Sequence, residues 1–380
     1  MEGEALSMAA LMSDQEVIDR VFRHIDAKTT DLGDGIWREP TDNYRSAERF
    51  ERELELLRRL PIVYCPSAAL PDNGSYIART ASGVPLVVVR GDDGVVRAFH
   101  NCCRHRGMAV AEGSGILRSF VCRYHAWTYG LDGGLKHIPA AHGFPDLDMA
   151  AHGLKQVHAE ERGGLVFVTQ KDPVSKGTLE DLPDLIEPNQ RVFLENTLSD
   201  EANWKLLMET SMEGYHIKAL HNSTFYPYGF DNLNVVETYG PNSRLAFPFR
   251  RIEKLRDMPR EQRRADGMLT YVYQLFPNVR LATLSSHYLL IILEPVTPSQ
   301  SQWHIYRLTP PSDDGSIDIE ESRRDAEFVR DTGVIEDREA ARAIQDGLKT
   351  EANSHFTFGR CEAAAVHFHK NLHAHLEKLR

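Results

Sequence analysis

Two short groups of cysteine and histidine constrain this chain more than any other feature of its sequence. The first is Cys103-x-His105, and the second, sixteen residues further along, is Cys122-x-x-His125. Two thiolates and two neutral imidazoles can hold a [2Fe–2S] cluster asymmetrically, with the cysteines on one iron and the histidines on the other. Because imidazole carries no negative charge, such a cluster has a higher reduction potential than an all-cysteine cluster. The pattern therefore predicts a centre that accepts electrons readily.

A zinc site with two cysteine and two histidine ligands is the alternative interpretation. Ordinary zinc spacings pair Cys with Cys and His with His, so the alternating order favours the iron–sulfur cluster. Cys102 is an alternative to Cys103 as a ligand, but we expect it to be a packed thiol. Because Cys102, Cys65 and Cys361 are an odd remainder, a disulfide framework is not indicated, and we expect a reducing, cytoplasmic environment.

Length and composition limit the remaining function classes. The 380 residues suffice for two domains. No apolar run approaches the roughly 18 residues of a membrane span, so no membrane association is expected. The first twelve residues lack a basic, apolar leader pattern, which argues against export. The net charge of −11 argues against nucleic acid as a partner.

The texture of the sequence predicts an α+β protein. A capping box at Ser13–Glu16 opens a helical pattern within residues 1–45, which we expect to pack on the domain over residues 175–380. Short β-branched runs separated by Gly and Asp turns predict a small antiparallel β domain over residues 46–174. Residues 175–380 then combine helices, the first over 202–220, with long strand-like stretches, which is typical of helices packed on an antiparallel sheet.

A second metal motif lies in the expected helix over 202–220. It reads Glu213-x-x-His216-x4-His221, and two histidines with one carboxylate are the ligands of oxygen-activating non-haem Fe(II). On a regular helix His216 and His221 would point about 140° apart, so we predict a break or π-type bulge within 217–220. Glu213 would neighbour His216 and bond the imidazole nitrogen that the metal leaves free.

Both motifs, together with Asn203-Trp204-Lys205, resemble those of the Rieske non-haem iron oxygenases. The resemblance covers nearly the whole chain. It implies a Rieske β domain joined to a helix-grip catalytic domain, with the [2Fe–2S] cluster on the cysteine–histidine pairs and a mononuclear Fe(II) on His216 and His221. The third iron ligand is implied at the start of a late helix, where we choose Asp337. Glu336 is the fallback, and an N-cap role for Asp337 is the alternative.

The resemblance also implies how the molecule works. It implies a homotrimer or a multiple of it, in which Glu213 links His216 to a cluster histidine of the next subunit. Many members carry Asp at this position, whereas Glu is frequent in members that demethylate quaternary amines. Electrons would come from NAD(P)H through a partner reductase, either directly or through a ferredoxin.

The function so implied is that of a terminal oxygenase, or alpha subunit, that uses O2 to mono- or dihydroxylate an aromatic or hydrophobic small molecule. Apolar strands favour this class and aromatic hydrocarbon catabolism. Oxidative N-demethylation of a betaine- or carnitine-like quaternary amine is the alternative. A Rieske-type electron carrier without oxygenase activity is the alternative from another class.

Weaker expectations concern the surroundings of these sites. We expect Glu209 to face a Lys or Arg. The arginine-rich segment 249–267 is interpreted as a solvated helix or loop, with a mobile cover over the substrate entrance as the alternative. The expected pocket lining is Leu207, Phe225, Tyr228, Leu275, Leu281, Leu284 and Leu290, and an aromatic cage would use Tyr226, Tyr228 and Tyr271. The tail histidines are expected on the wet side of an amphipathic helix: His367, His369, His373 and His375. A basic rim that attracts an acidic electron donor is expected from Arg104, Arg106, Arg118 and Arg123.

Overall fold

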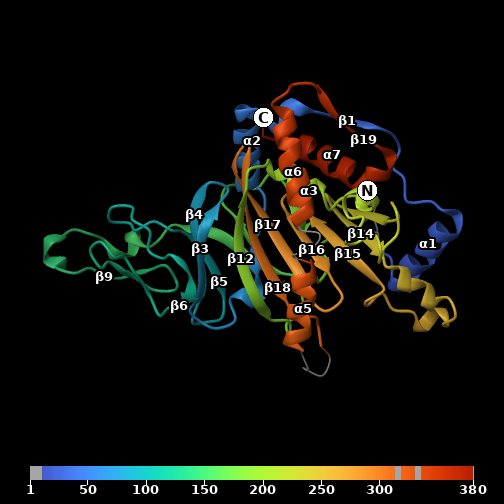
Figure 1. Ribbon diagram of the computed structural model, residues 1–380. Helices are drawn as coiled ribbons and strands as arrows, with labels where there is room; N and C mark the ends of the chain where they lie inside the picture. Colours follow the sequence, from blue (N-terminus) through green and yellow to red (C-terminus); the bar gives the residue numbers. More distant parts are fainter. Residues whose placement is uncertain (1–10, 313–317, 330–334, 380) are drawn as a thin grey trace, which may run out of the picture. The chain divides into compact units, whose positions relative to one another are not determined.

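The computed structural model describes residues 11–312, 318–329 and 335–379 (Figure 1). The chain divides into two compact units. The small unit contains Leu54–Ser175 and Pro183–Arg191, and the large unit contains Met1–Glu53, Lys176–Leu182 and Val192–Arg380. The predicted organisation, a helical segment over 1–45 that packs on the domain over 175–380 and a β domain over 46–174, stays a prediction.

The small unit consists of two antiparallel sheets. Its seven-stranded sheet has the order β2-β11-β10-β5-β4-β3-β6, and its three-stranded sheet has the order β7-β8-β9. The strands are β2 Ile62–Pro66, β3 Ser75–Ala81, β4 Val84–Arg90, β5 Val96–His100, β6 Gly113–Ile116, β7 Phe120–Val121, β8 Thr128–Tyr129, β9 Leu135–His137, β10 Gln156–Arg162 and β11 Leu165–Thr169. Gly and Asp turns separate these β-branched runs, as the sequence predicted.

A seven-stranded antiparallel sheet forms the core of the large unit. Its strand order is β12-β18-β17-β16-β15-β14-β13. The strands are β12 Val192–Asp200, β13 Val235–Tyr239, β14 Asn242–Pro248, β15 Leu269–Leu275, β16 Val279–Thr283, β17 Tyr288–Thr297 and β18 Gln300–Leu308. A separate pair joins β1, Trp37–Pro40, to β19, His355–Phe358. The expected α+β fold class is confirmed.

Seven α-helices lie in the described residues. They are α1 Asp14–Ala27, α2 Ala47–Arg58, α3 Trp204–Glu209, α4 Ile217–Leu220, α5 Ile319–Val329, α6 Ile335–Leu348 and α7 Ala363–Glu377. Of these, α1, α3 and α7 contact strands of this sheet. The helix α3 contacts α6 and β17, and α7, drawn in red, contacts β13 and β14 (Figure 1). In the described part of the chain, no helix combines the length and apolar character that crossing a bilayer requires.

The capping box that the sequence predicted begins α1. The Ser13 side chain accepts from the backbone N–H of Glu16, and the Glu16 carboxylate accepts from that of Ser13. The apolar face of α1, which includes Val17, Ile18 and Phe22, packs against residues of β13 and β14.

The single helix predicted over 202–220 is wrong. The segment is helical in α3, irregular through Thr210–His216, and helical again for one turn in α4. Gly214 lies in this irregular stretch, and a Cβ there would meet the Asn234 side chain at 3.1 Å. The interruption separates the helix that is anchored in the core from the turn that carries the histidines.

Candidate functional site

Two similar loops of the small unit carry the cysteine–histidine pairs. In the first, the N–H of Cys103 bonds the Met108 carbonyl and that of Gly107 bonds the Cys103 carbonyl. In the second, Cys122 N–H bonds the Trp127 carbonyl and Ala126 N–H bonds the Cys122 carbonyl. Gly107 and Ala126 both have positive φ, at 83° and 57°. Each loop is therefore a tight turn that starts at its cysteine and closes just after its histidine.

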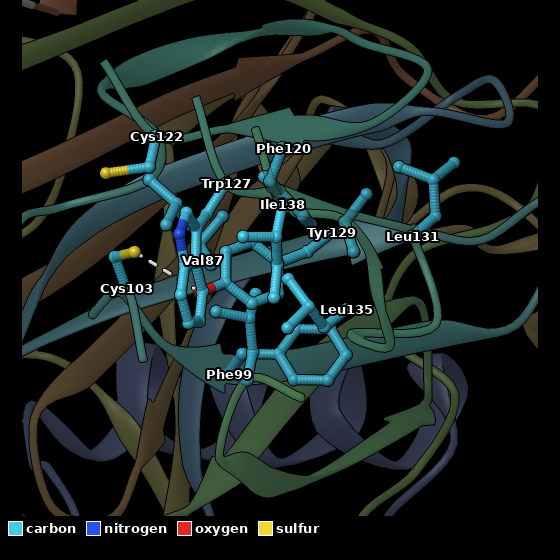
Figure 2. Packing of buried hydrophobic residues seen from close by; sticks show 13 residues of the cluster. Val87, Phe99, Cys103, Phe120, Cys122, Trp127, Tyr129, Leu131, Leu135 and Ile138 are labelled. Atoms are coloured by element: carbon cyan, nitrogen blue, oxygen red, sulfur yellow. Dashed lines mark hydrogen bonds between the residues drawn. The ribbon is translucent and has the colours of Figure 1, made fainter. Parts of the chain in front are cut away.

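The side chains of the two loops lie together as two pairs, the cysteines within an apolar cluster and the histidines against each other. Cys103 and Cys122 are buried, and Figure 2 shows their sulfur atoms at one end of that cluster. His105 is half-buried and His125 is exposed, and their Nδ1 atoms lie 3.0 Å apart. No carboxylate in the described ranges bonds either ring. Buried thiols beside two facing, solvent-side imidazoles fit the division of ligands in a [2Fe–2S] cluster held by two cysteines and two histidines.

Tyr129 is a residue of this site that the sequence analysis missed. Its hydroxyl lies 3.2 Å from Cys103 Sγ and accepts from the Arg104 backbone N–H at 2.9 Å (Figure 2). Burial raises the pKa of Tyr129, so the phenol keeps its proton and can donate it to the sulfur. A tyrosine four residues after His125 was the available signal, but core tyrosines are common.

A second group of ligands lies in the large unit. His221 Nε2 is 3.1 Å and His216 Nε2 is 3.6 Å from Asp337 Oδ1, and one ligand atom from each of the three residues lies within 4.8 Å of the others. Two imidazoles and one carboxylate suit non-haem Fe(II). Asp337 lies inside α6 rather than at its N-cap.

The two histidines converge because they bracket the short helix α4. His216 is the residue before it, and His221 follows it with φ −98° and ψ 33°, outside helical geometry. The predicted break within 217–220 is therefore misplaced: those four residues are the helical ones, and the backbone departs from the helix on either side.

A carboxylate also bonds the Nδ1 atom of each histidine, on the ring side away from Asp337. Glu213 bonds His216 Nδ1, as predicted from their spacing. Glu336 bonds His221 Nδ1 at 2.7 Å and accepts from the Thr224 hydroxyl at 2.7 Å. Burial lowers the pKa of both histidines, but these acids and Asp337 raise it more. A proton on each Nδ1 leaves each Nε2 free to bind a metal.

The Asn203-Trp204-Lys205 motif anchors the start of α3. The Asn203 side chain caps the helix by accepting from Lys205 N–H at 3.0 Å. Glu53 accepts from Trp204 Nε1 at 3.0 Å and from the Lys205 ammonium at 2.8 Å. Lys205 and Glu53 are each 1% exposed, so this is a buried ion pair.

Two expectations about buried polar groups are wrong. Glu209 does not face a Lys or Arg but accepts from the Tyr44 hydroxyl at 2.8 Å and bonds His369 Nε2 at 3.0 Å. His369 and His375 are buried, so the tail histidines do not share a wet face. The apolar residues of α7 were too irregularly spaced to predict that these two imidazole rings are buried beside polar partners.

A cavity of about 530 Å³ adjoins the His216, His221 and Asp337 group. Its wall is largely apolar and includes six Phe and Tyr side chains: Phe225, Tyr228, Phe230, Phe247, Phe249 and Phe328. Of the expected lining, Phe225, Tyr228 and Leu284 are correct. The others are wrong because they are buried core residues: Leu207, Leu275, Leu281 and Leu290. Tyr226 and Tyr271 do not line the cavity either.

Two arginines, Arg251 and Arg280, line the same cavity. Arg251 is exposed and donates to the Ser285 hydroxyl at 2.9 Å, whereas Arg280 is buried. Burial lowers the pKa of the Arg280 guanidinium, and the charge of Asp337 opposes that shift.

The arginine-rich segment forms two 3-10 helices, Arg250–Leu255 and Arg260–Gln262. Arg256 pairs with Asp26 at 2.7 Å, and Arg260 and Arg263 pair with Asp19 at 2.6 and 3.1 Å. These contacts with α1 favour the interpretation of the segment as a solvated helix or loop over that of a mobile cover.

The basic residues around the cysteine–histidine loops are mostly exposed. Arg106, Arg118 and Arg123 are exposed and Arg104 is half-buried. Arg123 forms an ion pair with Glu112 at 3.3 Å. Arg106 donates to the Tyr124 hydroxyl and has no acidic partner in the described structure.

Comparisons with known proteins agree with both sites. Residues 61–155 match the family described as Rieske [2Fe-2S] domain, and residues 189–378 match the family described as ring hydroxylating alpha subunit (catalytic domain). A glycine betaine monooxygenase oxygenase subunit of Chromohalobacter salexigens is 40% identical over 159 residues, which are 40% of this chain and 36% of that protein. A carnitine monooxygenase oxygenase subunit of Escherichia coli is 32% identical over 196 residues, 49% of this chain and 52% of that protein. The chain thus spans about half or less of the length of these curated relatives.

Solved structures share the fold. The quaternary ammonium Rieske monooxygenase CntA has a TM-score of 0.76 at 21% identity, over 98% of this chain and 99% of that one. Naphthalene 1,2-dioxygenase with indole bound has a TM-score of 0.73 at 18% identity, over 89% and 92%. The family matches, which cover the cysteine–histidine loops and the histidine–aspartate group, identify this chain as a member of the ring-hydroxylating alpha subunit family that carries a Rieske [2Fe–2S] domain.

Proposed function

We propose that this chain is the oxygenase component of a multicomponent system, and that it oxidises a quaternary amine with O2. The observation that carries the proposal is the paired arrangement of His216 and His221, with both Nε2 atoms toward Asp337 and both Nδ1 atoms on carboxylates. We assign the mononuclear Fe(II) to these three residues and the [2Fe–2S] cluster to Cys103, His105, Cys122 and His125.

The protein's own residues then have distinct tasks. The cluster stores single electrons and the iron, when bound, activates O2. Glu213 and Glu336 fix the tautomers of the two imidazoles. Glu213 is also the proposed link from His216 to a cluster histidine of a neighbouring subunit, in a homotrimer or a multiple of it. A reductase, with or without a ferredoxin, supplies the electrons from NAD(P)H.

Two observations favour a quaternary amine over an aromatic hydrocarbon. The relatives that match include enzymes named for glycine betaine and carnitine. The cavity wall offers aromatic faces, which attract a quaternary ammonium group through cation–π interactions. This reverses the order of preference that the apolar strands suggested, and the Glu at position 213 agrees with it.

Hydroxylation of an aromatic ring is the second candidate. An anthranilate 1,2-dioxygenase large subunit of Acinetobacter baylyi is 30% identical over 204 residues, 50% of this chain and 43% of that protein. The same aromatic cavity can hold a flat apolar ring. A pure electron carrier has no use for such a cavity beside a second group of ligands.

A single-turnover experiment tests the proposal without a partner protein. The iron-loaded protein is reduced chemically, freed of reductant, and mixed with O2 and either glycine betaine or naphthalene. We expect formaldehyde from glycine betaine and no diol from naphthalene. A diol without formaldehyde would favour the second candidate, and no product from either compound or from anthranilate would contradict the oxygenase proposal. The variant Asp337→Ala is the control, because it should abolish product while the cluster is retained.

A further inference from the structure

Arg280 lines the cavity, and the proposed function assigns it no task. It lies on β16 and is 6% exposed. Strand alternation puts it on the same face as Ala282, whose cross-strand neighbours Val272 and Leu289 also line the cavity. A cation therefore occupies the end of a lining that is otherwise apolar on these three strands, apart from Thr270.

The guanidinium of Arg280 lacks a partner that neutralises it. Among residues 11–312, 318–329 and 335–379, no carboxylate oxygen lies within 4.0 Å of its nitrogens and it makes no hydrogen bond. Its contact is with the Trp303 ring, whose centroid lies 5.2 Å away. A buried cation without an anion is costly, so such a side chain is normally paired or bound to a ligand.

A second arginine of the same sheet shows the paired alternative. Arg244 on β14 is also 6% exposed, but its guanidinium donates to Glu237 at 2.8 and 2.6 Å and to the Met12 carbonyl at 2.7 Å. The fold thus provides an acid where a buried arginine serves structure alone. Arg280 faces the cavity, whereas Arg244 faces an acid.

We propose that Arg280 binds a carboxylate of the substrate, so that the substrate is a zwitterion rather than a simple cation. This rests on the proposed function, which commits the Asp337 carboxylate to a metal and leaves little of its charge for Arg280. A guanidinium can donate two parallel hydrogen bonds to a carboxylate. A quaternary amine without an anionic group would instead be repelled by Arg280. The carboxylate at Arg280 and the ammonium group against the aromatic wall would direct an N-methyl group toward His216 and His221.

Equilibrium binding tests this on the resting, iron-loaded protein, without turnover. The probes are glycine betaine and choline, which share a trimethylammonium group but differ in carboxylate against alcohol, and benzoate with benzyl alcohol as an aromatic pair. By calorimetric titration we expect the carboxylates to bind about 10- to 100-fold more tightly than the alcohols. In Arg280→Met that preference should disappear while binding of the alcohols persists or improves.

Melting temperatures separate this role from a structural one. Arg280→Met should melt at the wild-type temperature or a few degrees above it, because an unpaired buried charge is removed. Arg244→Met is the matched control and should melt at least about 5 °C lower, because Glu237 is left unpaired.

The inference is overturned if neither carboxylate binds, if carboxylate and alcohol bind equally, if Arg280→Met keeps the preference, or if it melts as low as Arg244→Met. Because binding is measured without O2 or electrons, a failure to release formaldehyde would contradict the proposed function and leave this result standing.

Discussion

At the scale of single residues, carboxylates orient both imidazoles of the proposed iron site. The contact of Glu213 with His216 was predicted from their three-residue spacing on a helix, and it forms although the structure makes this stretch an irregular turn. Glu336 was predicted only as a fallback ligand, and its place behind His221 depends on how α6 meets α4 in space. Arg280 was not predictable, since a lone arginine in a strand gives no signal of what it faces, and the spacing of Tyr129 from His125 was too weak a signal to separate it from a core tyrosine.

Glu336→Ala tests this support directly. Without the carboxylate on Nδ1, the His221 ring loses the hydrogen bond that fixes its tautomer and orientation, so we expect the mononuclear site to bind iron about 10- to 100-fold more weakly. Competition with a chelator, followed by iron analysis, measures this affinity. Glu339→Ala, exposed on the same helix, is the control and should bind iron as the wild type does. Equal affinity in all three proteins would show that Glu336 has no supporting role.

At the scale of elements, buried charges fix the helices that carry the site. The strands from β15 to β18 were predictable because short apolar runs bounded by turns are typical of buried strands. The division between α3 and α4 was not predictable, because most residues of Ala202–Leu220 favour a helix and the interruption depends on tertiary contacts. Likewise, the helical spacing of Phe50, Leu54 and Leu57 predicts α2, but not its Glu53 pair with Lys205.

Glu53→Ala should destabilise the protein strongly. It leaves the Lys205 ammonium buried without a partner, which typically costs about 3–5 kcal/mol. The free energy of unfolding in urea measures the loss. Glu55→Ala, which removes a more exposed pair with Lys171, should cost less than about 1 kcal/mol. Similar losses in the two variants would mean that the Glu53 pair does not hold α3 in place.

Glu39, in β1, makes stability depend on acid pH. Burial raises its pKa, but the hydrogen bond from His373, the charge of His369 and the hydrogen bond from Asn43 outweigh it and lower the pKa from 4.5 to about 2. The ionised carboxylate therefore stabilises the fold above about pH 4.5, by roughly 3 kcal/mol, and this is lost as the pH falls toward 2. Urea unfolding of the wild type and Glu39→Gln should differ most near neutral pH and converge toward about pH 2. A difference that stays constant would contradict this.

At the scale of the whole molecule, the chain combines a match to the Rieske [2Fe–2S] domain with a match to the ring-hydroxylating catalytic domain in a single polypeptide. Both ligand sets were predictable because metals demand particular side chains at short spacings. The substrate was not, since the cavity wall is drawn from several strands and helices whose contacts only the fold defines.

Arg106→Glu tests where electrons enter. A basic rim should attract an acidic ferredoxin, so reversing this charge should slow reduction of the cluster several-fold at low salt. The effect should nearly vanish near 1 M salt, where the screening length is about 3 Å. Stopped-flow reduction by a ferredoxin measures the rates, with exposed Arg162→Glu in the same unit as control. The same slowing at both salt concentrations would exclude electrostatic attraction.

The most direct test of the account is the iron and acid-labile sulfide content of the purified chain, compared with that of His216→Ala/His221→Ala. The account predicts three irons and two sulfides per wild-type chain, and two of each in the double variant, since the [2Fe–2S] cluster takes two irons and the mononuclear site one. Two irons in both proteins, or zinc in place of iron, would contradict it.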